Sequence, residues 1–128
     1  MEDIEQLATI AIDCGFKLHN ALGPGLLESV YEAVLLDSLT QRGLAAERQV
    51  SVPIKFNGRT FDEGFRVDIL IERKLVVELK SMERLAAVHG KQVLTYLRLM
   101  GLPLGLLMNF GAATYREGIK RIANDYYR

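Results

Sequence analysis

Apolar residues recur every three or four positions in three long segments of the chain. This spacing predicts helices over residues 4–21, from Leu26 to about Arg42, and from Arg84 to Met100. A Gly-Pro-Gly turn at residues 23–25 separates the first two helices, because neither glycine nor proline favours a helix interior.

Between the second and third helices, apolar residues alternate with polar ones or form short continuous runs, as they do in β-strands. An Asn-Gly pair at residues 57–58 is a strong hairpin signal, and Gly64 is expected to break the strand that follows it. The predicted strands are residues 49–56, 59–63, 65–71 and 75–80, with a fifth, 104–110, after the third helix. Residues 115–127 are expected to form a short, partly helical tail.

This order of elements, α-α-β-β-β-β-α-β plus a tail, predicts the α/β (α+β) class. We expect one mixed sheet of four or five strands flanked by helices. The 128 residues fit a single domain, residues 1–128. With 49% apolar and 25% charged residues, the chain has the composition of a folded protein rather than a disordered one.

Charge and cysteine content narrow the functional classes. Lys+Arg and Asp+Glu both number 16, so the net charge is zero, which disfavours tight duplex binding by bulk electrostatics but permits a local basic patch. The single cysteine, Cys14, cannot form an internal disulfide and predicts a reducing compartment. The acidic N-terminal residues do not resemble a signal peptide, and the apolar stretch over residues 101–113 is too short to span a bilayer. We therefore expect a cytoplasmic location and no membrane contact.

The hairpin before the third helix carries ionisable residues within a mainly apolar sequence. If this hairpin is centred on Arg73, Asp68 faces Glu78 with Cβ atoms about 4.5–5.5 Å apart, and Lys80 shares the face of Glu78. Facing carboxylates repel each other unless one is protonated or a cation lies between them. The alternative is a solvated face on which Lys80 neutralises the acids, but residues 75–77 indicate a buried strand, where unpaired charge is costly.

Two helices carry further polar candidates. Glu28 lies in the first turn of the second helix, where a carboxylate also stabilises the positive end of the helix dipole. Gln92 and Tyr96 are four residues apart on one face of the third helix, together with His89. Alternatively, these three residues form the polar margin of an amphipathic helix.

Together these segments resemble the GxxExxY family of the PD-(D/E)XK nuclease superfamily. The matching motifs are HxxLGPGLLESVY from His19, VDIL from Val67, VELK from Val77, QxxxY from Gln92 and GLLMNF from Gly105. The resemblance extends from about Ile12 to Ile122, and the α-β-β-β-α-β core of the superfamily matches the predicted order from the second helix onward. The family name motif falls on Gly25, Glu28 and Tyr31, whereas Val67 stands in place of the superfamily's proline.

This resemblance implies a PD-(D/E)XK restriction-endonuclease-like core and a Mg²⁺-dependent nuclease in which Mn²⁺ substitutes. It implies that the metal ligands are Asp68, Glu78, the carbonyl of Leu79, and Glu28. Such a donor set consists of hard oxygens, which Mg²⁺ prefers.

The remaining roles are also implied by the resemblance. Lys80 would stabilise the scissile phosphate or the attacking water, and Gln92 and Tyr96 would orient Lys80 or a phosphate oxygen. His19 matches a family position without an assigned role, and capping or packing at the end of the first helix is its alternative. The expected substrate is DNA rather than RNA, in DNA repair or processing.

Two other functions remain open from the sequence. One is a non-catalytic nucleic-acid-binding or regulatory module that keeps the nuclease fold, and the other is a hydrolase of a small phosphate ester. A homodimer or partner-protein contact is also open, and the candidate residues for it are Leu102, Leu104, Tyr126 and Tyr127.

Overall fold

The computed structural model describes residues 3–125, apart from the side chain of Glu63. Its helices are α1 (Ile4–Leu22), α2 (Glu28–Gln41), α3 (Ala87–Met100) and α4 (Tyr115–Gly118). Its strands are β1 (Ala46–Phe56), β2 (Arg59–Ile71), β3 (Leu75–Lys80), β4 (Leu104–Asn109) and β5 (Ile119–Ala123). The mixed α+β class predicted from the sequence is confirmed.

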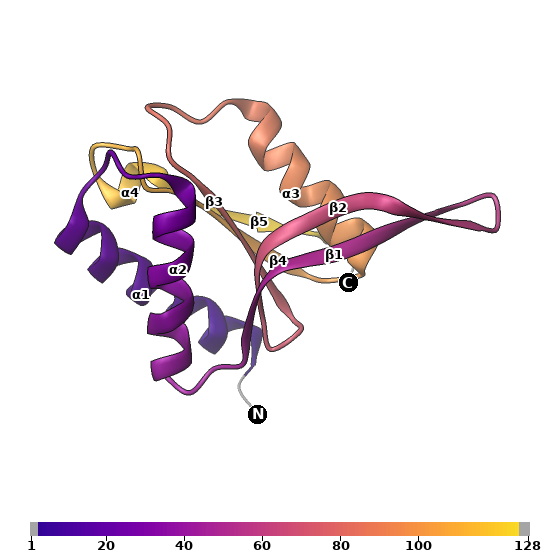
Figure 1. Cartoon of the computed structure of the whole chain (residues 1–128), viewed down its shortest axis with the longest axis horizontal. Coiled ribbons are helices and arrows are strands. Elements are labelled where there is room, and N and C mark those ends of the chain that lie inside the picture. Colours follow the sequence, from indigo (N-terminus) through magenta and orange to yellow (C-terminus); the bar gives the residue numbers. More distant parts are fainter. Residues whose placement is uncertain (1–2, 126–128) are drawn as a thin grey trace.

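The strands form one five-stranded sheet in the order β1-β2-β3-β4-β5. Neighbouring strands are antiparallel except β3 and β4, which run parallel because α3 connects them. Figure 1 shows α1 and α2 on one side of the sheet and α3 on the other. No helix within residues 3–125 is long and apolar enough to cross a membrane.

Each side of the sheet has its own hydrophobic core. The larger cluster joins α1 and α2 to the sheet and contains Leu35, Leu39 and Val77 among its buried residues. The smaller cluster lies under α3, where Val93 and Leu97 pack against the sheet. With both faces covered, β3 and β4 are buried at nearly every position.

The predicted strand break at Gly64 is wrong, because β2 runs through this residue without interruption. The β1–β2 register shifts between Val52 and Ile54. A Cβ atom on residue 64 would lie 2.0 Å from the carbonyl oxygen of Val52, so only glycine allows this close approach. Gly64 therefore permits a bulge within a long strand.

The C-terminal segment also differs from the prediction. Only residues 115–118 are helical, and residues 119–123 form β5, which pairs with β4 at the edge of the sheet. The preceding helices begin later than predicted: α2 begins at Glu28 rather than Leu26, and α3 at Ala87 rather than Arg84. The two partly buried isoleucines of β5, Ile119 and Ile122, are three residues apart, so the sequence lacks the alternation that predicts a strand.

The residues considered for an intermolecular contact are only partly available for one. Leu104 is buried in the larger core cluster, which removes it as a surface candidate. Leu102 packs partly buried against the smaller cluster. Tyr126 and Tyr127 lie outside the described residues.

Candidate metal site between β2 and β3

The β2–β3 hairpin has the register predicted from the sequence. Its ladder pairs Ile71 with Leu75, Leu70 with Val76 and Ile69 with Val77. The same register would place Arg66 opposite Lys80, but the backbone ladder ends at Ile69 and Val77, so this pair does not form. On their other sides, Arg66 pairs with Ser51 in β1 and Lys80 with Asn109 in β4.

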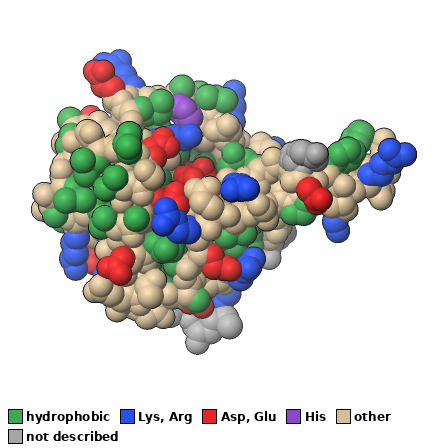
Figure 2. All heavy atoms as spheres, in the orientation of Figure 1, with side chains coloured by type: hydrophobic (Ala, Val, Ile, Leu, Met, Phe, Trp, Pro, Cys, Tyr) green, Lys and Arg blue, Asp and Glu red, His purple; other side chains and the backbone are tan. Residues whose placement is uncertain are grey.

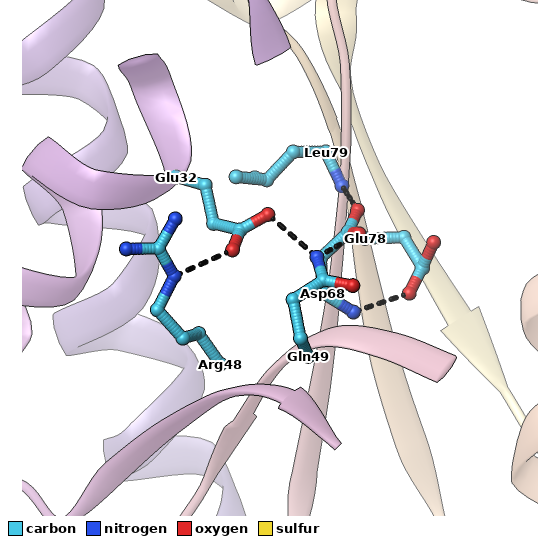
Figure 3. A network of polar contacts seen from close by, with 6 residues as sticks. All are labelled: Glu32, Arg48, Gln49, Asp68, Glu78 and Leu79. Atoms are coloured by element: carbon cyan, nitrogen blue, oxygen red, sulfur yellow. Dashed lines mark hydrogen bonds and ion pairs between the residues drawn. The ribbon is translucent and has the colours of Figure 1, made fainter. Parts of the chain in front are cut away.

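Where the ladder ends, Asp68 and Glu78 connect the two strands through their side chains. The Asp68 N–H donates to Glu78 Oε1 at 2.9 Å, and the Leu79 N–H donates to Asp68 Oδ2 at 2.8 Å (Figure 3). Each carboxylate thus accepts a backbone proton from the opposite strand in place of a carbonyl. Two acidic side chains are consequently held together at the opening of the hairpin.

The third member of this network is Gln49 in β1. Its backbone has φ 52°, in the left-handed region that non-glycine residues rarely adopt, and it forms no ladder pair with Asp68 opposite. The Gln49 Nε2 atom donates to Asp68 Oδ1 at 3.3 Å and to Glu32 Oε2 at 2.9 Å. Such a backbone conformation inside a strand, outside a turn, costs free energy and is a mark of many functional sites.

The pleat of β2 is interrupted at the same point. Val67 and Leu70 are three residues apart, yet both pack in the cluster under α3, whereas Ile69 packs on the side of α1 and α2. Strict alternation would place Val67 and Ile69 on the same face. The irregularity beside Gln49 therefore changes the direction in which Asp68 projects.

Glu32 on α2 is a site residue that sequence reasoning missed. It is only 5% exposed, and Arg48 Nε donates to its Oε1 at 2.9 Å (Figure 3). Its negative charge raises the pKa of Asp68, after the larger effect of burial. Glu32 shares a helical stripe with buried Leu35 and Leu39, and an acid on such an apolar stripe was the available signal.

The structure does not bring Glu28 to the carboxylate pair. Glu28 is exposed at the first position of α2, and it lines an open hollow of about 390 Å³ with Ser29 and Ser81. Within residues 3–125, no three His, Cys, Asp or Glu side chains form a group that could hold a metal ion. A role for Glu28 as a metal ligand therefore stays a prediction.

The tyrosine of the GxxExxY motif has a structural role. The Tyr31 hydroxyl donates to the Gly23 carbonyl at 2.5 Å and accepts from the Leu26 N–H at 3.2 Å. Its ring stacks on Phe110 with centroids 4.7 Å apart. Tyr31 thereby fixes the turn from which α2 begins.

Of the two α3 candidates, Tyr96 is within the electrostatic influence of the acidic pair. Burial raises the pKa of its hydroxyl, and the negative charges of Glu78 and Asp68 raise it further. Its ring stacks on Phe65 with centroids 4.1 Å apart. Gln92 is exposed one turn earlier and has no polar contact with Lys80 among the described residues.

Two histidines considered earlier serve the scaffold. His19 is buried, lies 3.0 Å from the Ala112 carbonyl through Nε2, and stacks on Phe110. His89 Nδ1 accepts the Ala86 N–H at 2.9 Å and so caps α3. These contacts favour the packing and capping interpretations over a role in the site.

Asn109, at the end of the strand beside Lys80, fixes the loop that follows β3. Its side chain accepts the Met82 N–H at 3.0 Å and donates to the Met82 carbonyl at 2.9 Å. Gly111 allows this close packing, since a Cβ there would lie 2.4 Å from Met82 backbone atoms. These two hydrogen bonds fix the direction of the chain after Lys80.

Electrostatics at the carboxylate pair favour a bound cation. Burial, followed by the charge of Asp68, raises the pKa of Glu78 to about 8. Burial also raises the pKa of Asp68, although the Leu79 N–H bond opposes this. A divalent cation would relieve the repulsion between two desolvated carboxylates, and their oxygens are the ligands that hard cations prefer. The residues present therefore fit such an ion.

The fold and this geometry define an α+β domain whose central hairpin opens onto paired carboxylates, with a lysine two residues further along β3. A family model described as the PD-(D/E)XK nuclease superfamily matches residues 5–122. The chain belongs to that superfamily, whose members generally use divalent metal ions and act on nucleic acids. A search of curated proteins and a search of solved structures each found no match. The narrower GxxExxY assignment rests on the sequence motif alone.

Proposed function

We propose that this chain is a Mg²⁺-dependent nuclease that hydrolyses phosphodiester bonds in DNA, in a repair or processing pathway. The observation that carries the proposal is the pair of partly buried Asp68 and buried Glu78, joined across the end of the β2–β3 ladder. Unpaired carboxylates at such a position would be costly without a cation, and Lys80 lies on the same strand. Superfamily membership supports the chemistry.

Asp68, Glu78 and the carbonyl of Leu79 would hold the ion, with Mn²⁺ able to replace Mg²⁺. Glu32 is the helical carboxylate that the contacts through Gln49 favour as a further ligand or as a holder of ligand water. Glu28, one helical turn earlier, is the candidate that the motif favours. If Glu32 is the ligand, its substitution weakens metal binding; if Glu28 is the ligand, substitution of Glu28 does so.

When bound, a divalent cation supplies the positive charge that activates water and stabilises the phosphoryl oxygens. The ammonium group of Lys80 would stabilise negative charge that develops on the phosphate. The charges of Glu78 and Asp68 raise the pKa of the Tyr96 hydroxyl, which would position a phosphate oxygen. Gln92 would assist from the preceding turn of α3. The buried walls of the hairpin strengthen each of these interactions by lowering the local dielectric.

A non-catalytic nucleic-acid-binding module is the second candidate function. It is favoured by the Gln49 amide, which donates hydrogen bonds to both Glu32 and Asp68 and so partly stabilises their charges without a cation. Under this alternative, the carboxylates would remain as structural links between the strands. Turnover separates the two functions.

The test is cleavage of labelled DNA and RNA by wild type, Asp68→Ala and Lys80→Ala, with Mg²⁺, Mn²⁺ or a chelator. We expect metal-dependent cleavage of DNA by wild type and a loss of at least about a hundredfold in each variant. Asp37→Ala and Lys17→Ala are matched controls, because both residues are exposed on α2 and α1. Equal rates in wild type and the Asp68 and Lys80 variants would reject the nuclease function.

A further inference from the structure

The β1–β2 hairpin extends well beyond the rest of the molecule. Residues 51–66, here called the arm, project from the sheet with no helix against their outer part (Figure 1). Near its end the arm exposes two aromatic rings: Phe56 is 65% exposed and Phe61 is 43% exposed. Figure 2 shows hydrophobic and basic side chains gathered at this end.

One face of the arm combines aromatic, aliphatic and basic side chains. The ladder places Ile54 opposite Phe61 and Phe56 opposite Arg59, and residues two apart share a face. Lys55, paired with Thr60, projects from the other face. Flat rings beside a guanidinium group are the combination on which nucleic-acid bases stack.

The aromatic strip is continuous with the candidate site. Phe65 at the base of the arm stacks on Tyr96, and the charges of Glu78 and Asp68 raise the pKa of the Tyr96 hydroxyl. Phe61 and Phe56 follow outward along the same hairpin. A strand of nucleic acid held at Asp68 and Glu78 therefore has aromatic rings along its path.

Charge on the outer arm is of one sign. Its paired residues 54–61 contain Lys55 and Arg59 and no acidic residue, whereas Asp62 and Glu63 follow directly toward the base of the arm. Arg66 is exposed at the base, close in sequence to Asp68. These cations are complementary to phosphate groups.

The exposed apolar area is too small for a stable dimer interface. At 150–250 Å² for a whole aromatic side chain, the exposed parts of Phe56 and Phe61 together offer about 200 Å². A standard interface takes roughly 800 Å² from each partner, and its core is depleted in charge, unlike a face that carries Arg59. A nucleic-acid strand needs no such area, because each stacked base contributes separately.

We propose that the arm binds single-stranded DNA, with unpaired bases stacking on Phe56 and Phe61 and a phosphate contacting Arg59 on the same face. This inference rests on the proposed nuclease function and names its substrate as DNA with an unpaired segment beside the cleaved bond. From Asp68 to Arg59 the strand reaches about 30 Å, which equals roughly nine base steps of stacked strand. A substrate that reaches from the carboxylate pair to the end of the arm is therefore about that length or longer.

The test measures binding of fluorescein-labelled oligothymidylate by fluorescence anisotropy in a chelating buffer, where turnover cannot interfere. For strands of about 15 nucleotides, we expect Phe56→Ala and Phe61→Ala each to weaken binding about tenfold. Strands of about 4 nucleotides can occupy the arm alone, so the same variants should weaken their binding as well. Arg59→Ala should reduce the slope of log affinity against log salt by about 0.7. Phe16→Ala is the matched control, because Phe16 is an exposed phenylalanine on α1.

Two outcomes would overturn this role of the arm. They are unchanged affinity in both phenylalanine variants, and a change from dimer to monomer by light scattering in Phe56→Ala. The last result would assign the strip to a second copy of this chain. Failure of the nuclease function is distinguishable, because it would leave arm-dependent binding intact while wild type cleaves nothing.

Discussion

Gln49 and Asp68 lie opposite each other in β1 and β2, yet they meet through side chains rather than through the backbone ladder. The Gln49 Nε2 atom lies 3.3 Å from Asp68 Oδ1 and 2.9 Å from Glu32 Oε2. The left-handed backbone of Gln49 accompanies this arrangement. An amide group thus lies between two carboxylates, where positive charge is most stabilised.

We expect Gln49→Ala to lower the melting temperature in chelator and to enlarge the gain in melting temperature on adding Mg²⁺. Without the amide, Arg48 still pairs with Glu32, but no side chain lies between Glu32 and Asp68, so a bound cation relieves more of their repulsion. Differential scanning fluorimetry in both buffers measures the effect. Gln41→Ala is the control, since its amide bonds the exposed Asp37 on α2. The same loss in both buffers would reduce Gln49 to a structural role.

The raised pKa of Glu78 predicts that the free energy of unfolding depends on pH. Its pKa is raised from 4.5 to about 8 in the folded protein, so the folded state holds this proton more tightly than the unfolded state. In chelator, the stabilisation is complete below about pH 4.5 and is lost as the pH rises to about 8.

The variant Glu78→Gln should remove that decline. Its side-chain oxygen still accepts the Asp68 N–H, while the negative charge is gone. Urea unfolding of both proteins across this pH range gives the comparison, with Glu83→Gln as an exposed control. Parallel curves for wild type and Glu78→Gln would contradict the raised pKa. Asp68→Asn is less suitable, because both carboxylate oxygens of Asp68 accept hydrogen bonds.

Glu32 and Glu28 can be separated by metal affinity. If Glu32 is the helical carboxylate of the site, Glu32→Gln should weaken Mn²⁺ binding about tenfold, and Glu28→Gln should leave it unchanged. Isothermal titration calorimetry measures both dissociation constants. The opposite ranking would favour the motif position and would show that α2 rotates or shifts when the ion binds.

Two glycine substitutions test the backbone interpretation. Gly64→Ala should destabilise the protein by about 2–3 kcal/mol, because the added Cβ would lie 2.0 Å from the Val52 carbonyl oxygen. Gly90→Ala in α3 should stabilise it by about 0.5–1 kcal/mol, since the new Cβ meets only the Ile122 side chain at 3.5 Å. Thermal unfolding of both variants checks the pair, and a tolerated Gly64→Ala would mean that the bulge relaxes easily.

Much of the fold could be predicted because long apolar patterns specify it. The three long helices, the Asn-Gly hairpin and the buried β3 follow from periodicity. The register of Ile69 with Val77 followed from keeping polar and apolar faces apart. The continuity of β2 through Gly64 could not be predicted, because glycine is common both in β-bulges and where strands end.

The candidate site was only partly predictable for a different reason. Asp68 and Glu78 are neighbours through a local hairpin, so their proximity follows from register. Glu32 and Gln49 reach Asp68 through tertiary packing and a distorted backbone, neither of which leaves a periodic signal. Glu28 was a candidate because it belongs to the motif. Glu32, one turn later, was not recognised because it lies on the apolar stripe of α2.

The end of the β2–β3 backbone ladder provides two amide groups that report on the site by NMR spectroscopy. The amide protons of Asp68 and Leu79 are bound by carboxylates instead of carbonyls. Their chemical shifts and hydrogen-exchange rates must therefore follow the charge on Glu78 and Asp68. Two backbone resonances can record protonation and cation occupancy directly, without a substrate and without any engineered label.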